Sequence, residues 1–160
     1  MKLSTRGRYA VMAMADMAQE QKQGRQGPFR LSEIAERQEI SLSYLEQIFG
    51  DLRRAKLVNS QRGAHGGYVL AQNASDIRIG DVIGAVDEPV EVTRCQVASG
   101  CLGKHARCLT HDLWAELGEH IHAFLNGVSL ADVVAGNKIA APEPLFCEQI
   151  SQLKQAGDYR

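Results

Sequence analysis

Three of the four cysteines and two of the five histidines of this chain lie within seventeen residues, from Cys95 to His111. Cys95, Cys101, Cys108 and His111 would supply three thiolates and one imidazole. This soft donor set suits zinc, copper(I) or an iron–sulphur cluster and is poor for magnesium or calcium. The segment therefore predicts a metal or cluster site.

The spacing of these four residues narrows the choice of metal. Structural zinc sites usually take their ligands in close pairs, about two to four residues apart. Here five residues separate Cys95 from Cys101, six separate Cys101 from Cys108, and only Cys108 and His111 form a short pair. Two glycines in the loop would let the backbone bend around a bulky centre, so the pattern favours a two-iron cluster over zinc.

Disulfides and a thiol redox switch are the competing interpretations of the cysteines. No apolar signal segment follows Met1, and the longest apolar runs are too short to span a bilayer. We therefore expect a cytoplasmic protein with no membrane partner, whose thiols stay reduced. Cys147, far from the loop, is expected to be an ordinary thiol.

The charge of the chain divides into two unlike halves. Of its 160 residues, 44% are hydrophobic and 23% charged, which is typical of a folded protein. Residues 1–70 carry eleven Lys and Arg against seven Asp and Glu, a balance of +4, whereas residues 71–160 carry seven against twelve, a balance of −5. The basic half is the candidate for a polyanion partner.

A first helix is predicted near the N-terminus, with Ser4 or Thr5 as its cap. Apolar residues recur there at the spacing of a single helical stripe, at Tyr9, Ala10, Ala13, Met14 and Met17. Lys2, Arg6 and Arg8 lie at its leading end, where free amides and the helix dipole attract phosphate.

Two short helices follow a predicted loop at 19–29. The first, over 31–38, has Ser32 as its expected cap, and the second begins at Ser41. Its apolar face is predicted at Leu42, Leu45, Ile48, Phe49 and Leu52. Two short helices joined by a tight turn make a helix-turn-helix. The second helix is expected to present Ser43, Tyr44, Glu46, Gln47 and Arg54 outward. These side chains could bind a partner, or they could form an ordinary solvated helix face.

A predicted hairpin comes directly after the second helix. Residues 57–62 and 68–70 have strand patterns, and the glycine-rich turn 63–67 joins them. Arg62 and His65 lie at its tip, where a cationic side chain can enter a narrow minor groove. This order predicts a winged helix that binds double-stranded DNA.

The acidic half contains one strongly amphipathic helix. A short helix is predicted over 79–86, and one of about four turns over 112–126, stopped by Gly127. The longer helix has its apolar face at Leu113, Leu117, Ile121, Phe124 and Leu125, with Trp114 beside it. We expect this face to form a dimer seam, to fold back on the first helix, or both. His120 and His122 are expected on the helix surface, and Ser129 is expected to cap a last short helix.

The sequence thus predicts a mainly α fold with a small β wing. We expect a winged-helix DNA-binding domain over 1–75, a linker helix and cluster-binding loop over 76–111, a dimerisation helix and short helix over 112–135, and a mobile tail over 136–160. No catalytic constellation is recognisable, so we expect a binding protein and not an enzyme.

Several stretches together resemble the IscR family of bacterial iron–sulphur cluster regulators. They are residues 1–11, 40–49 and 85–88, the wing glycines with Arg62, and the pattern Cys-x5-Cys-x6-Cys-x2-His. The resemblance covers about residues 1–135. It implies a homodimeric winged-helix repressor of cluster-assembly genes, holding a 2Fe-2S cluster on the three cysteines and His111 and receiving it from the cluster assembly machinery.

The same resemblance implies roles for residues facing DNA. Glu46 matches the acid that discriminates between two operator classes, since a carboxylate can accept from a cytosine amino group. The expected DNA contacts are Lys2, Arg8, Ser41, Ser43, Tyr44, Glu46, Gln47, Arg62 and His65. The loop from Cys101 to Cys108 is one residue longer than the family pattern. A nitric-oxide-sensing iron–sulphur repressor on the same scaffold and a zinc-stapled DNA-binding regulator are the alternatives.

Overall fold

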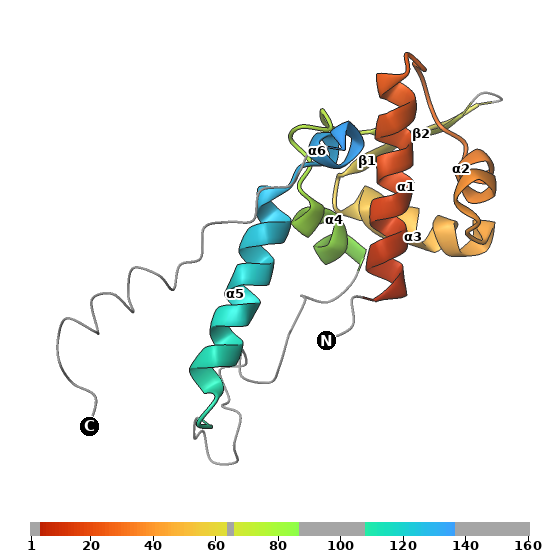
Figure 1. Ribbon diagram of the computed structural model, residues 1–160. Coiled ribbons are helices and arrows are strands. Elements are labelled where there is room, and N and C mark those ends of the chain that lie inside the picture. Colours follow the sequence, from red (N-terminus) through yellow and green to blue (C-terminus); the bar gives the residue numbers. More distant parts are fainter. Residues whose placement is uncertain (1–3, 64–65, 87–107, 137–160) are drawn as a thin grey trace, which may run out of the picture.

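The computed structural model describes residues 4–63, 66–86 and 108–136. The elements are α1 (Thr5–Lys22), α2 (Leu31–Gln38), α3 (Leu42–Arg54), β1 (Val58–Gln61), β2 (Gly67–Leu70), α4 (Ile79–Val86), α5 (His111–Gly127) and α6 (Leu130–Ala135). Figure 1 shows α2 on one side of α1, α4 and α6 on the other, and α5 projecting from this body. The predicted fold class, mainly helical with a small β wing, is confirmed.

Helix α1 is the central element of the core. The Ser4 hydroxyl oxygen accepts a hydrogen bond from the Gly7 amide at 2.9 Å, which confirms Ser4 as the cap. The predicted stripe is buried at Ala10, Ala13, Met14 and Met17. The loop predicted from residue 19 is wrong for its first four residues, because good helix formers carry α1 to Lys22.

Helix α2 starts without the predicted cap. Ser32 lies inside the first turn, and the residue at the cap position, Arg30, makes no side-chain capping bond. Just before it, the Phe29 amide donates to the Tyr68 carbonyl at 2.8 Å, and the Tyr68 amide donates back to the Phe29 carbonyl at 2.9 Å. These bonds hold the entry to α2 extended, so β-pairing, not a serine, sets where the helix begins.

Helix α3 follows a turn at Glu39, whose φ of 53° is left-handed. The Ser41 hydroxyl caps it by accepting from the Tyr44 amide at 3.3 Å, as predicted. The residues predicted to pack inward at Leu45, Ile48, Phe49 and Leu52 are fully buried. Leu42 is 43% exposed, because the first turn of α3 reaches beyond the core, and the prediction that it packs inward is wrong.

The two strands form the predicted antiparallel hairpin. Val58 pairs with Leu70 and Gln61 with Gly67. The wing is anchored to the body by Tyr68, whose ring meets Phe49 edge-on at a centroid distance of 4.9 Å. Close approach of the Gly67 and Phe29 backbones leaves no room for a Cβ at residue 67.

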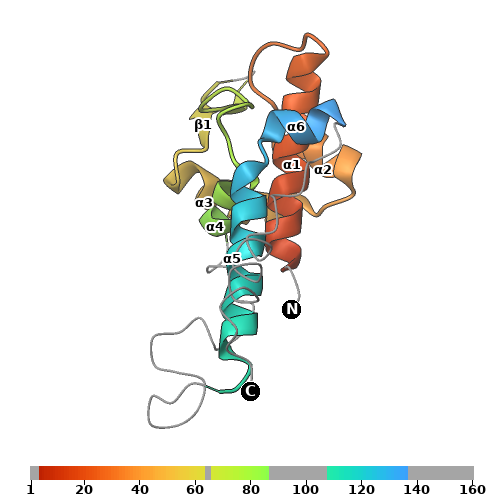
Figure 2. The same ribbon diagram turned by 60° about the vertical axis from the view of Figure 1, so that its left-hand side comes forward.

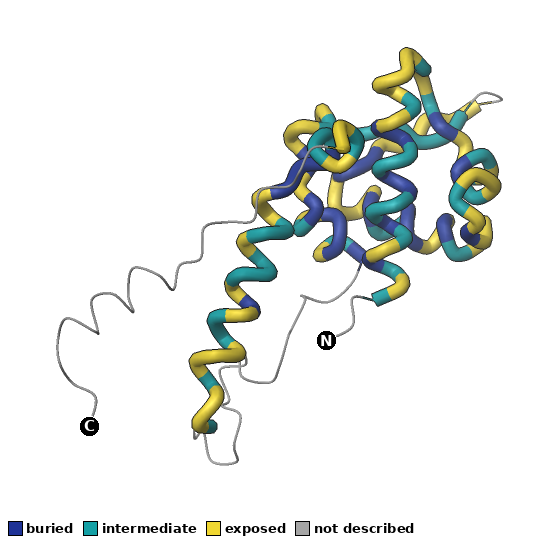
Figure 3. Tube along the Cα trace, viewed as in Figure 1, coloured by how far each residue is buried: buried dark blue, intermediate teal, exposed yellow. Residues whose placement is uncertain are grey.

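Helices α4 and α6 complete the core against α1. The buried residues of α4 are Ile79, Val82, Ile83 and Val86. Figure 3 shows the buried residues concentrated in α1, α3 and α4. The predicted cap of α6 is confirmed as a capping box, in which the Ser129 and Asp132 side chains each bond to the other's backbone amide.

Helix α5 begins and ends one residue outside its predicted span. Phe124 and Leu125, near its C-terminal end, pack against the core, chiefly beside α4 and not α1. Leu113 and Leu117 in its first half are 59% and 38% exposed. Figure 2, like Figure 1, shows this half extending away from the body. Within the described residues, no helix is long and apolar enough to cross a membrane.

Candidate DNA-binding face and metal ligands

The side of α3 opposite the core carries a row of polar side chains. Ser43, Glu46 and Gln47 are exposed, and their spacing of three and four residues places them on one helix face. Ser41, at the cap position before them, is also exposed. The exposed face of α3 therefore presents an amide, a carboxylate and hydroxyl groups to a binding partner.

Tyr44 is half-buried and does not belong to this outward row. Its ring meets the Tyr9 ring of α1 edge-on, with centroids 5.9 Å apart and an angle of 84° between the planes. Such a pair stabilises the contact between helices. The prediction that Tyr44 faces outward is therefore wrong for its ring, which joins the start of α3 to α1.

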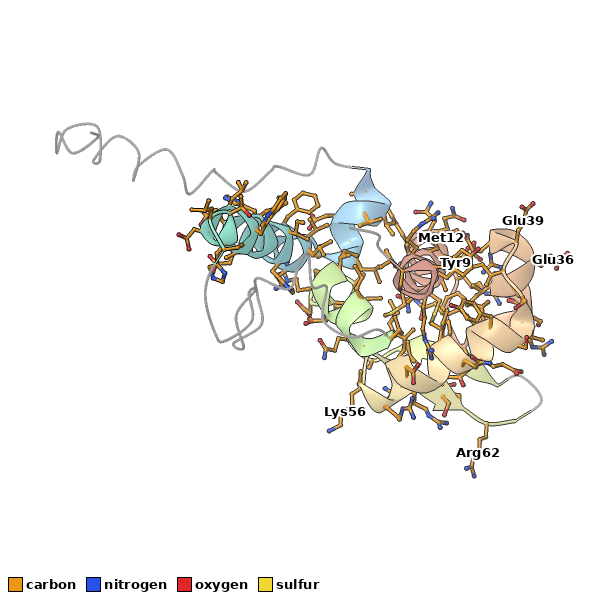
Figure 4. The ribbon with its side chains drawn as sticks, turned by 90° about the horizontal axis from the view of Figure 1, so that it is seen from below. Tyr9, Met12, Glu36, Glu39, Lys56 and Arg62 are labelled. Atoms are coloured by element: carbon orange, nitrogen blue, oxygen red, sulfur yellow. The ribbon has the colours of Figure 1, made fainter. Side chains whose placement is uncertain are left out.

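The wing places a cation beside the polar row. Arg62 directly follows β1 and is exposed. Figure 4 shows Arg62 and Lys56 projecting from the same side of the body, with α3 between them. Both cations therefore add positive charge to this side of the body. His65, predicted at the same wing tip, lies outside the described residues.

The basic residues at the start of α1 have different surroundings. Arg8 is exposed, as a phosphate contact requires. Arg6 is instead half-buried in an ion pair with Asp51 of α3, which also pairs with Arg54. Arg6 therefore acts between helices, and its guanidinium ties the start of α1 to α3. Lys2 lies outside the part of the chain that the structure describes.

Ion pairs that the sequence did not predict fix α2 against α1. The Asp16 carboxylate, 8% exposed, accepts from Arg37 Nε and Gln38 Nε2, each at 3.0 Å. The hydrogen bond to Asp16 raises the pKa of Arg37 above its ordinary value. Arg25, in the loop after α1, pairs with both Glu20 of α1 and Glu33 of α2. These ion pairs hold α2 against α1, and only a tight turn separates α2 from α3.

Two of the four predicted metal ligands lie together at the start of α5. His111 is the first residue of the helix, and its amide donates to the Cys108 carbonyl at 3.0 Å. Cys108 is partly exposed. The other two, Cys95 and Cys101, lie outside the described residues, and no group of three candidate ligands gathers within them.

The donors of this pair fit an iron–sulphur centre. Thiolates are the usual protein ligands of iron–sulphur clusters, and imidazoles replace some of them in certain centres. Cys108 precedes α5 and His111 is its first residue, and the N-terminal amides of the helix favour negative charge. His120 and His122 are further along α5, and the His120 ring lies 3.4 Å from the Glu116 carboxylate. The prediction that these two histidines are helix-surface residues is consistent with their partial exposure.

Comparison with known proteins assigns the chain to a family. Residues 3–136 match the family model Rrf2, described as an iron-dependent transcriptional regulator. A regulator named IscR from Serratia proteamaculans is 54% identical over 134 residues, which cover 84% of this chain and 79% of that protein. An IscR from Yersinia pseudotuberculosis is 52% identical over 139 residues, covering 87% and 82%.

Solved structures agree with these relatives. The IscR of T. potens is 38% identical, with a TM-score of 0.69 over 86% of this chain and 89% of that one. CymR of B. subtilis, titled the global cysteine regulator, is 30% identical with a TM-score of 0.72, covering 86% and 99%. The relatives are regulators and not enzymes. The chain is therefore a winged-helix transcriptional regulator of the Rrf2 family, similar to IscR.

Proposed function

We propose that this regulator senses the supply of iron–sulphur clusters with a 2Fe-2S cluster and represses the genes for cluster assembly. Two relatives that match more than four-fifths of the chain carry the name IscR. The residues predicted as cluster ligands are Cys95, Cys101, Cys108 and His111. The observation that carries the proposal is the placing of Cys108 and His111 together where α5 begins.

The proposed reader of DNA is the polar row of α3 together with the wing. Ser43, Glu46 and Gln47 would meet base edges in the major groove, and Arg62 would enter the adjacent minor groove. Phosphate contacts would come from Lys2, Arg8 and Ser41, which position the protein without reading sequence. His65 would lie with Arg62 at the minor groove. The exposed outer face of α3 and the exposed Arg62 support this assignment.

The cluster ligands and the reader are connected through packed helices. The far end of α5 packs on α4, where the Asn126 side chain closes over Gly80. In turn, α4 packs on both α1 and α3, with Ile83 against Gly7. The fraction of protein that holds a cluster would report how much cluster is available in the cell. A change at Cys108 and His111 on cluster binding would then be transmitted along α5 to α4 and the reading helix.

The exposed half of α5 supports a homodimer. Leu113 and Leu117 of the apolar face are exposed there, and so is Trp114 beside them. A second copy that packs on this face would remove apolar surface from water. Two reading helices would then meet a near-palindromic operator. The cluster assembly machinery is the proposed cluster donor, and the cytoplasm the proposed location.

The test of this function is the metal content and DNA binding of anaerobically purified protein. We expect iron and acid-labile sulphide in equal amounts and visible absorbance, which Cys108→Ala should abolish. Cys147→Ala is the matched control, because it removes a thiol outside the ligand set, and it should keep full colour. Zinc without sulphide would contradict the proposal, as would operator binding that does not change when the cluster is removed.

A further inference from the structure

The hydroxyl of Thr110 lies between a predicted cluster ligand and the chain's single tryptophan. Its Oγ1 atom is 3.6 Å from the Cys108 sulphur and accepts a hydrogen bond from Trp114 Nε1 at 3.1 Å. All three residues belong to the last turn before α5 and its first turn. The three side chains therefore form one short hydrogen-bonded line.

Thr110 occupies the cap position of α5 without acting as a cap. A threonine at this position normally accepts from a backbone amide two or three residues further on. Here the side chain makes no such bond, and its partners are Cys108 and Trp114 instead. Residues that depart from the usual local pattern are often found at functional sites.

The direction of the two hydrogen bonds at Thr110 follows from which atoms carry a proton. An indole N–H can only donate, and a hydroxyl has one proton and two lone pairs. Trp114 therefore fills one lone pair of the Thr110 oxygen. A cysteine sulphur that binds iron carries no proton and can only accept. The Cys108 sulphur, 3.6 Å from Thr110 Oγ1, is then positioned to accept the Thr110 proton.

We propose that Thr110 donates a hydrogen bond to the Cys108 sulphur of the bound cluster, that Trp114 positions this donor, and that the pair raises the cluster's reduction potential. This inference rests on the proposed function. Donors to a ligand sulphur withdraw negative charge and stabilise the reduced cluster more than the oxidised one. Thr110 is thus a tuning residue, and Trp114 acts through it.

The test compares Thr110→Val with Thr110→Ser in anaerobically loaded protein. Valine keeps the shape of threonine and removes the hydroxyl, whereas serine keeps the hydroxyl. The protein is titrated with dithionite, and the visible circular dichroism of the cluster monitors its one-electron reduction. The quantity compared between variants is the midpoint potential. We expect a more negative potential for Thr110→Val and a potential close to wild type for Thr110→Ser.

Trp114→Phe tests the positioning role. It also provides a second measurement if the valine variant takes up little cluster. Phenylalanine keeps an aromatic ring without the N–H, so we expect a smaller shift in the same direction. Equal potentials in wild type, Thr110→Val and Trp114→Phe would overturn the inference. If Thr110→Val takes up no cluster, an unchanged potential in Trp114→Phe overturns it. Wild-type protein lacking iron and sulphide would instead overturn the proposed function, and this inference with it.

Discussion

Glu46 is the charged residue among the three exposed side chains of the α3 row, and its proposed role is to discriminate between operators. It is exposed between Ser43 and Gln47, where a carboxylate accepts from a base amino group and is repelled where only acceptors face it. We expect Glu46→Ala to reduce the discrimination of cluster-free protein between operators by about tenfold, equivalent to about 1.4 kcal/mol. Binding titrations of two operator sequences at one fixed salt concentration measure this ratio.

Glu36→Ala is the matched control for Glu46, because it removes an exposed acid from α2 and leaves the α3 row intact. It should keep the selectivity of the wild type. Equal selectivity of all three proteins would show that Glu46 has no discriminating role.

Two glycines with opposite surroundings give a second prediction at the residue scale. A Cβ at Gly67 would clash with the Phe29 carbonyl, whereas a Cβ at Gly50, within α3, meets nothing within 4 Å. We expect Gly67→Ala to lower the free energy of unfolding by about 1 to 3 kcal/mol. Gly50→Ala should raise it by up to about 1 kcal/mol, because alanine favours the helix.

Urea unfolding at one protein concentration measures both glycine variants. If Gly67→Ala were as stable as wild type, the backbone bridge between Phe29 and Tyr68 would not hold the wing to the body.

Among the elements, α6 depends on an ionised cap. The Ser129 hydroxyl and amide both donate to the Asp132 carboxylate, at 2.6 and 3.0 Å, and these bonds lower the pKa of Asp132 below its ordinary 3.8. Because the folded pKa is the lower one, this stabilisation is present above about pH 4 and is lost as the pH falls through the folded pKa.

Asp132→Asn should therefore be less stable than wild type at pH 7, and the difference should shrink as the pH falls below 4. Thermal unfolding of both proteins between pH 3 and 7 checks this expectation. A difference that stays constant over this range would contradict the role of the Asp132 charge.

At the scale of the whole molecule, the exposed half of α5 is the proposed dimer contact. We expect Leu117→Glu to weaken the proposed dimer by at least about a hundredfold, because an unpaired buried charge costs about 3 to 5 kcal/mol. Ala123→Glu is the control, since it adds the same charge at an exposed position about 120° around α5 from Leu117 and outside the apolar face. Sedimentation analysis gives the mass of each variant, and circular dichroism its helix content. Dimers of unchanged stability in Leu117→Glu would exclude this face.

Much of the fold follows from interactions within one or two turns of chain, which is why the sequence predicted it. Ser4 and Ser41 cap their helices as predicted, and the glycines after Arg62 mark the hairpin turn. The donor types of Cys108 and His111 are likewise a property of the residues themselves. Caps, turns and apolar periodicity need no knowledge of what lies across the core.

Tertiary packing decided the rest, because each remaining feature depends on a partner distant in the chain or on side-chain geometry. Backbone pairing of Phe29 with Tyr68, and not a Ser32 cap, precedes α2. Tyr44 packs against Tyr9, and Arg6 pairs with Asp51. The contacts of Thr110 depend on the conformation at the start of α5. The sequence alone determined which chemical groups this regulator has. The three-dimensional arrangement determined which of them meet, since partners far apart in the chain are brought together only by the packing of whole helices.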